Sequence, residues 1–222
     1  METVRYLYRG GQGEIEEKKS RFIANLRPVE NEEEAQAFIN EMKKKYWDAR
    51  HNCSAFVTGE NGEITRCSDD GEPSGTAGRP MLEALKNSGV RNVAVVVTRY
   101  FGGVLLGTGG LIRAYGEAVR AGLNNSVIIE KINGVLCYAR LEYPDLARLN
   151  HILQAPPFLI KDTIYGEKVE FELLLPMDEL ESASKKVTEI CGGRVELKPK
   201  QTCRYAKAGD ELVITDVKRF GG

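Results

Sequence analysis

The chain has 222 residues, of which 42% are hydrophobic and 28% are charged, and its formal net charge is −1. This length can bury a full core in one large or two small domains. The near-zero charge excludes a general attraction to nucleic acid or to an anionic membrane, so any basic surface has to be local. The sequence shows no apolar run of membrane-spanning length, and its N-terminus lacks the apolar core of a signal peptide. We therefore expect a cytoplasmic protein with no membrane partner.

The cysteines indicate reduced thiols rather than a disulfide framework. They are widely spaced and form no CxxC pair: Cys53, Cys67, Cys137, Cys191 and Cys203. His51 and Cys53 give an HxC spacing, which Cys67 could complete in space, but this is a weak signal for a metal site. We predict neither a metal nor a cofactor.

In chain order, the first half begins with two predicted strands, at 4–8 and 20–26. A helix is predicted from Asn31, because NEEEAQAFINEMKKKYW has a capping asparagine, acids in its first turn and lysines in its last. HNCSAFVT at 51–58 predicts a strand, and Glu60-Asn61-Gly62 predicts a hairpin turn that leads to a strand at 63–66.

The next stretch combines an acidic loop, a buried strand and a glycine-rich turn. The loop SDDGEPSGTAG at 68–78 precedes a short predicted helix at 81–86. An apolar run rich in β-branched residues at 92–98 predicts a buried strand. After the glycines a helix is predicted at 111–123, and Gly122 with Asn124-Asn125 is expected to terminate it.

The second half predicts the element order β-α-β-β-α-β, which is the split βαβ of a ferredoxin-like domain. Strands are predicted at 134–143, 158–164 and 168–175, with further strand material at 195–205 and 211–217, and helices at 144–153 and 177–190. The pattern restarts around 126–133 without a Pro/Gly-rich linker. We therefore expect a domain of residues 1–128 followed by one of residues 129–222.

The glycine-rich turn is a candidate anion-binding site. In GGVLLGTGGLIR, backbone N–H groups at a helix start lie near arginines, and this combination binds phosphate or carboxylate. The pattern lacks the lysine of a Walker loop and is not GxGxxG. An equally weighted alternative is that the glycines only permit a tight turn and close helix-to-sheet packing. The candidate residues are Arg99, Tyr100, Gly102, Gly103, Gly107, Thr108, Gly109, Gly110 and Arg113.

The acidic loop is a candidate cation site, since hard cations prefer carboxylate and hydroxyl oxygens. Its candidate residues are Ser68, Asp69, Asp70, Glu72, Ser74 and Thr76. No ordered ligand spacing is present, so we favour the alternative that these side chains cap N–H groups of the loop itself. Ser74 is not in a GxSxG elbow and the two histidines give weak acid–base candidates, so no catalytic residue is predicted.

The acidic loop and the glycine-rich turn together are similar to the signature of a known family. SDDGEPSGTAGRPMLEAL followed by NVAVVVTRYFGGVLLGTGGLIRAYGEA resembles the signature of the YigZ/IMPACT family over about residues 20–127, and the second half looks like the extra C-terminal domain of bacterial members. The resemblance implies an α+β protein with a ribosomal protein S5 domain 2-like fold followed by a ferredoxin-like fold. It also implies a general translation-related or nucleic-acid-binding role, because eukaryotic IMPACT proteins regulate translation by competing for an activator of an initiation-factor kinase. It brings no catalytic set.

Three functions are compatible with these features. The first is a non-enzymatic translation or stress factor that binds RNA, the ribosome or a protein partner through the face around Arg99, Tyr100 and Arg113. Between residues 79 and 120 six basic residues stand against two acidic ones, which favours such a face. The second is an enzyme acting on a phosphorylated or acidic small molecule, with Asp69 and Asp70 holding a cation. The third is a protein-interaction module in which both motifs are structural.

Overall fold

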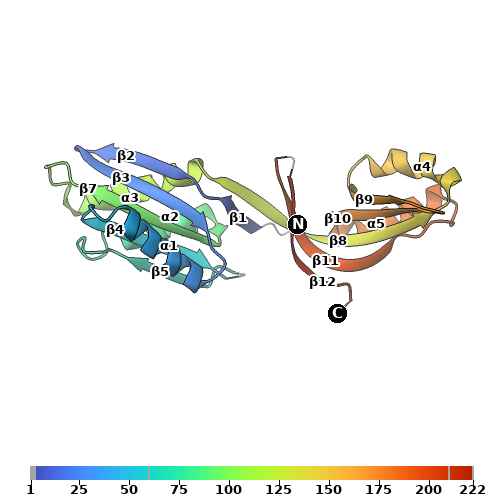
Figure 1. Cartoon of the computed structure of the whole chain (residues 1–222), viewed down its shortest axis with the longest axis horizontal. Coiled ribbons are helices and arrows are strands. Elements are labelled where there is room, and N and C mark those ends of the chain that lie inside the picture. The colour runs from blue at the N-terminus through green and yellow to red at the C-terminus, as the bar shows by residue number, and fades with distance from the viewer. Residues whose placement is uncertain (1–3, 60, 210, 222) are drawn as a thin grey trace. The chain divides into compact units, whose positions relative to one another are not determined.

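The computed structural model of the chain describes residues 4–59, 61–209 and 211–221. It forms two compact units, one spanning Val4–Glu130 and one beginning at Lys131 (Figure 1). Each unit combines helices with a largely antiparallel sheet, which confirms the predicted α+β class. No helix among the described residues is both long and apolar enough to cross a membrane.

A five-stranded antiparallel sheet forms the frame of the first unit. Its central strand, β7 (Val93–Tyr100), is buried at every position up to its last residue, as the apolar run predicts. The strands lie in the order β2 (Gln12–Glu17), β3 (Ser20–Pro28), β7, β4 (His51–Thr58) and β5 (Ile64–Ser68). β4 and β5 pair as the expected hairpin, although Glu60 of its turn lies outside the described residues.

Strand β2 was not predicted from the sequence. Its sequence QGEIEE shows no apolar alternation, because three of its six residues are glutamates. Backbone pairing with β3 from Gln12↔Asn25 to Glu17↔Ser20 forms the strand instead. β2 is therefore an edge strand whose polar side chains suit its position.

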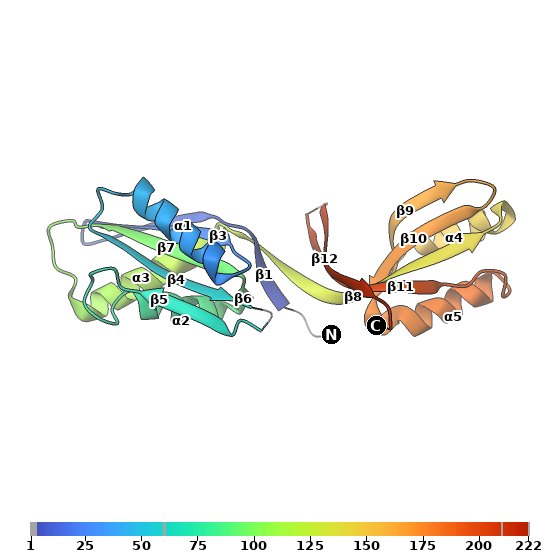
Figure 2. The same ribbon diagram turned by 60° about the horizontal axis from the view of Figure 1, so that its bottom comes forward.

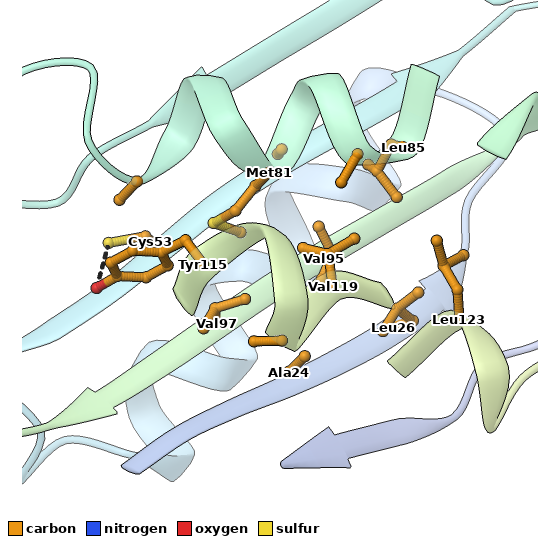
Figure 3. Close-up of a cluster of buried hydrophobic side chains, with 14 of the residues drawn as sticks. Ala24, Leu26, Cys53, Met81, Leu85, Val95, Val97, Tyr115, Val119 and Leu123 are labelled. Atoms are coloured by element: carbon orange, nitrogen blue, oxygen red, sulfur yellow. Dashed lines mark hydrogen bonds between the residues drawn. The ribbon is translucent and has the colours of Figure 1, made fainter. Parts of the chain in front are cut away.

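Helices cover both faces of this sheet. α1 (Glu32–Lys45) packs on one face against Ala94 and Val96, and Asn31 caps it as predicted, its Oδ1 accepting a hydrogen bond from the N–H of Glu34 at 2.8 Å. α2 (Gly78–Ser88) and α3 (Gly107–Asn124) cover the opposite face. Figure 3 shows this second core, in which side chains of both helices meet those of β3, β4 and β7: Ala24, Leu26, Cys53, Met81, Leu85, Val95, Val97, Tyr115, Val119 and Leu123.

Helix α3 begins earlier than predicted, and it ends at Asn124 with Asn125 as its C-cap, close to the predicted end. It begins at Gly107 rather than at Leu111, so three of the glycines lie in its first turn and not ahead of it. It also passes through Gly122, which does not terminate it. A Cβ on Gly122 would lie 2.2 Å from Leu26 Cδ1, and one on Gly13 of β2 would lie 2.2 Å from the backbone nitrogen of Gly122. Gly13 and Gly122 therefore serve close packing between α3 and the sheet.

Three further strands lie outside the five-stranded sheet and neighbour one another in the order β8 (Val127–Leu141), β1 (Val4–Arg9) and β6 (Val90–Arg91). The pairing of β1 with β6 is parallel. β8 begins seven residues before the predicted strand at 134–143 and runs through the stretch where the pattern restarts. Ile128, Ile129 and Ile132 give this stretch β-branched side chains, which favour a strand over a loop.

The second unit has the ferredoxin-like order β-α-β-β-α-β followed by one added strand. After β8 come α4 (Tyr143–Leu153), β9 (Leu159–Tyr165), β10 (Val169–Pro176), α5 (Leu180–Ile190), β11 (Lys198–Ala208) and β12 (Glu211–Arg219). The antiparallel sheet order β9-β10-β8-β11 is that of a split βαβ, which confirms the predicted topology. α5 begins three residues later than predicted, because a 3₁₀ turn at Met177–Glu179 precedes it.

Candidate functional site

The two motifs singled out in the sequence meet at one end of the first unit's sheet. In the register of the sheet, Arg21 of β3 lies opposite Tyr100 of β7, His51 of β4 lies opposite Arg99 of β7, and Ser54 of β4 lies opposite Ser68 of β5. Since neighbouring strands are antiparallel, the segments before β3 and β4 and after β5 and β7 emerge at the same end (Figures 1 and 2). The acidic loop follows β5 and the glycine-rich loop follows β7, so the fold brings both to this end.

Asp69 organises the acidic loop from within. Its carboxylate accepts backbone hydrogen bonds from Gly75 (2.8 Å), Ala77 (3.0 Å) and Gly78 (2.8 Å) at the start of α2. Burial by itself would raise the pKa of Asp69, but these three N–H donors outweigh it and lower the pKa. Ala77, the N-cap residue of α2, has no side-chain acceptor. Asp69 supplies the missing acceptor, so it closes the loop and caps helix α2. This agrees with the alternative favoured from the sequence, in which the side chains of the loop cap its own N–H groups.

Asp70 ties the loop to its surroundings. Its Oδ1 accepts from Lys43 Nζ of α1 at 2.5 Å, and its Oδ2 accepts from the backbone N–H of Asn52 at 2.7 Å. Nδ1 of His51 lies 2.9 Å from the carbonyl oxygen of Asp70. Both carboxylate oxygens of Asp70 are thus engaged by protein donors.

The hydroxyl candidates of the loop act locally. Ser68 Oγ accepts from the N–H of Asp70 at 3.3 Å, and Thr76 Oγ1 donates to the carbonyl of Pro73 at 2.7 Å. Ser74 is exposed. Among the described residues no group of three His, Cys, Asp or Glu side chains is arranged to hold a metal ion.

Glu72 and Arg99 form an ion pair inside the unit. Glu72 Oε1 accepts from Arg99 Nη1 at 2.6 Å and from the hydroxyl of Tyr115 at 2.8 Å. The two charged side chains are 3% and 8% exposed. The guanidinium lies between two rings, 5.5 Å from the ring centre of Phe22 and 5.6 Å from that of Phe101. Arg99 is therefore an interior residue and not part of the exposed face expected around it.

The thiol beside this ion pair is not an activated nucleophile. Cys53 Sγ lies 3.3 Å from the hydroxyl of Tyr115, the contact drawn in Figure 3. Burial raises the pKa of Cys53 to about 12, and burial together with Cys53 and Glu72 raises the pKa of Tyr115. A reactive cysteine needs a lowered pKa, so this cluster is a structural one.

Gly102, Gly103 and Gly107 of the glycine-rich segment each have a clear structural reason for glycine. A Cβ on Gly102 would lie 2.0 Å from the backbone carbon of Lys19, and Gly103 has a φ of +85°. Gly109 has neither reason, because its φ is not positive and a Cβ there would meet nothing within 4 Å. Gly107, like Gly103, adopts a positive φ, and a Cβ on Gly110 would touch Leu106 at 3.0 Å.

The glycine-rich segment also carries a group of exposed apolar side chains, which we call the apolar tip. They are Phe101 (55% exposed), Val104 (44%), Leu105 (82%) and Ile112 (41%). Arg113 and Thr108 beside them are exposed, whereas the hydroxyl of Tyr100 is bound to Asp48 at 2.9 Å. The tip was not predicted from the sequence, although the run Val104-Leu105-Leu106 inside a glycine-rich loop is a readable signal.

The tip adjoins an uncapped helix start. Leu106 is the N-cap residue of α3 and offers no side-chain acceptor, and the first turn contains no acidic residue. The first backbone N–H groups of a helix have no partner within it, so this end favours negative charge. Thr108 and Gly109 in this turn are exposed. Apolar area and backbone donors thus lie on one segment.

An exposed apolar surface such as the tip, next to polar side chains that are engaged within the fold, is typical of a binding protein. Residues 18–123 match the Impact N-terminal domain, and residues 140–194 match a domain of unknown function, DUF1949. The chain is 44% identical over 206 residues to the IMPACT family member YvyE of Bacillus subtilis (strain 168), covering 93% of this chain and 95% of the relative. It is 38% identical over 182 residues to the IMPACT family member YigZ of Escherichia coli (strain K12), covering 81% and 89%.

A solved structure, described as the crystal structure of an hypothetical protein, aligns with a TM-score of 0.57 at 36% identity and covers 89% of this chain and 97% of that one. The chain belongs to the IMPACT family.

Proposed function

We propose that this chain is a regulatory factor of translation that binds a protein partner through the apolar tip. Membership of the IMPACT family supports the translational role, because the resemblance to eukaryotic IMPACT proteins implies regulation of translation by competition for a protein. The observation that carries the choice of partner is the apolar tip itself. Four large apolar side chains within twelve residues are exposed at the end of the sheet where the family's signature motifs meet.

The chemistry of the tip favours a protein over RNA. Arg99, which an RNA-binding face would need, is buried against Glu72, and Tyr100 is bound to Asp48. Leu105, Val104 and Ile112 offer aliphatic area, which suits an apolar groove, and Phe101 is the single ring of the tip on which a base could stack. The uncapped start of α3 adds a preference for a carboxylate near that groove.

The enzyme alternative has less support from the same geometry. It needs Asp69 and Asp70 to share a cation, yet both carboxylates accept hydrogen bonds from protein donors. Glu72 is in turn engaged by Arg99 and Tyr115. With these bonds, the acidic loop supports the fold of the sheet end at which the apolar tip lies.

The test is a titration of the purified full chain into a bacterial cell-free translation extract, with reporter synthesis as the readout. The wild type is expected to change the rate of synthesis in a saturable way. Leu105→Ser removes a side chain that is 82% exposed and so leaves the fold intact. Losing the burial of one leucine at an interface should raise the half-maximal concentration about tenfold or more.

The matched control is Ile164→Ser, which removes another exposed aliphatic side chain, 57% exposed, from β9 of the second unit. It should behave as the wild type. An extract that does not respond to the wild type at concentrations above that of its ribosomes would refute the translational role. Equal responses to Leu105→Ser and wild type would refute the tip as the contact.

A further inference from the structure

The second unit carries a concave basic surface that neither motif nor the proposed function uses. Strands β11 and β12 pair with Gln201 opposite Arg219 and Thr202 opposite Lys218, and the N–H of Phe220 donates to the carbonyl of Lys200 at 2.9 Å. Lys198 of β11 pairs with Tyr138 of β8, which brings that ring beside the start of β11. Strand pairing thus assembles a hollow of about 720 Å³ lined by Tyr138, Lys200, Lys218, Arg219 and Phe220 among others, which we call the basic cleft.

The charge of the basic cleft has one sign. Three cations and no carboxylate line it. In the described part of the second unit, salt bridges join six cations to acids: Arg140, Lys161, Lys168, Lys185, Arg194 and Lys198. Lys200, Lys218 and Arg219 are not among these six. An anionic ligand is the partner that such a surface lacks.

The acid that contacts Tyr138 of the cleft wall is already engaged. Glu172 accepts from the hydroxyl of Tyr138 at 2.8 Å through Oε1 and from Lys161 Nζ at 2.9 Å through Oε2. Lys161 therefore forms an ion pair with the carboxylate that Tyr138 also contacts. Lys200 instead lies over the ring of Tyr138, with Nζ 3.7 Å from the ring centre. This cation–π contact holds the ammonium group in place without removing its charge.

Aromatic rings decide the class of anion. Tyr138 and Phe220 both line the cleft, and Phe220 is 36% exposed. Unpaired cations beside a partly exposed ring such as Phe220 are the combination that binds single-stranded nucleic acid, where the cations follow the phosphates and the ring stacks on a base. A duplex hides its base faces, and an acidic peptide has none, so neither would use the ring. The cleft volume falls within the roughly 300–1,000 Å³ of sites that hold small ligands, such as a nucleotide of the strand.

A second hollow continues the path. It measures about 410 Å³, shares Tyr138 and Lys200 with the basic cleft and adds Arg140, Arg194 and Lys198. Arg140 pairs with Glu170, Lys198 with Glu196 and Arg194 with Asp145, so Lys200 is the cation of this hollow that has no acidic partner among these salt bridges. The two hollows meet at Tyr138 and Lys200, so a strand can pass from one to the other beside the ammonium group of Lys200. We propose that the basic cleft of the second unit binds single-stranded nucleic acid, through contacts independent of the apolar tip.

The test measures fluorescence anisotropy of a labelled oligouridylate of about 12 nucleotides with the full chain, at several salt concentrations. With three cations on the phosphates, the logarithm of the association constant should fall against the logarithm of salt with a slope of about −2. Lys200→Ala/Lys218→Ala/Arg219→Ala should abolish this slope and most binding. Phe220→Ala should weaken binding about tenfold through lost stacking.

Two controls isolate the site. Lys185→Ala/Lys186→Ala removes exposed cations from α5 of the same unit, and Leu105→Ser removes the apolar tip of the first unit. Both should bind the oligonucleotide as the wild type does, whatever the fate of the proposed function. The proposal is overturned if the triple variant and the α5 variant bind equally. It is also overturned if a duplex or polyglutamate binds as tightly as the oligouridylate and Phe220→Ala changes nothing.

Discussion

Glu72 and Arg99 place two full charges in the interior of the first unit, 3% and 8% exposed. Taking an ion pair out of water costs several kcal/mol per charge, and only short, well-directed hydrogen bonds offset it. Glu72 has two such bonds, from Arg99 at 2.6 Å and from Tyr115 at 2.8 Å, whereas Arg99 Nε has no partner. The pair is therefore sensitive to the loss of either member.

Glu72→Gln is expected to lower the free energy of unfolding by about 3–5 kcal/mol, because it leaves the Arg99 charge buried without a counterion. Adding Arg99→Met should restore a large part of this loss, since the double variant buries no charge. Urea unfolding of the single and double variants measures both values. Glu14→Gln breaks a 2.6 Å ion pair with Arg21 on the surface and should leave the unfolding midpoint nearly unchanged. Strictly additive single-variant losses would contradict this account.

For single residues, the sequence predicts contacts with residues that are close along the chain. Asp69 lies in a turn-forming loop just before a helix, so capping can be inferred from the local pattern, and the structure has it. The partner of Arg99 lies 27 residues away in sequence and reaches it only through folding of the acidic loop. The basic count around Arg99 suggests an exposed face, but strand β7 carries Arg99 into the interior.

Among the elements, α3 has two kinds of glycine on its two ends. Gly122 near its C-terminus packs against β2, where Gly13 approaches its backbone closely. Gly109 in the first turn has open space around its missing Cβ. The first kind is required by the fold, and the second is not.

Gly13→Ala is expected to destabilise the first unit by about 1–3 kcal/mol, because its Cβ would lie 2.2 Å from the backbone nitrogen of Gly122, which cannot move aside as a side chain can. Gly109→Ala is the matched variant and should leave stability unchanged or raise it by up to about 1 kcal/mol, since alanine loses less backbone entropy in a helix. Thermal unfolding of both variants measures the difference. Destabilisation by Gly109→Ala as large as that by Gly13→Ala would show that the first turn is also sterically closed.

Elements with a strong apolar period can be predicted from the sequence, and elements that depend on their neighbours cannot. α1, β4 and β7 were found where their patterns lie. β2 has no apolar pattern and exists through its pairing with β3. The start of α3 was missed because glycines are poor helix formers, although the helix continues into them.

In the whole chain, the order of elements carries different amounts of information in the two units. In the second unit β-α-β-β-α-β predicts the ferredoxin-like sheet order, because few topologies accommodate it. In the first unit β7 lies between β3 and β4, and its pairing with β3 spans about 70 residues of sequence. Periodicity does not specify such a pairing, and only the family resemblance predicts the fold there.

Each unit has hydrophobic clusters of its own, which predicts separate local stability. Val187→Ala removes two buried methyl groups from α5 in the second unit, and Val95→Ala does the same in β7 of the first, both side chains being fully buried in the wild type. Each substitution should cost about 2 kcal/mol. Native-state hydrogen exchange should then show faster exchange of slow amides in the substituted unit, by about thirtyfold, and little change in the other. If either variant accelerated the slowest amides of both units equally, the two cores would have to unfold as one, and their separate clusters would not define separate folding units.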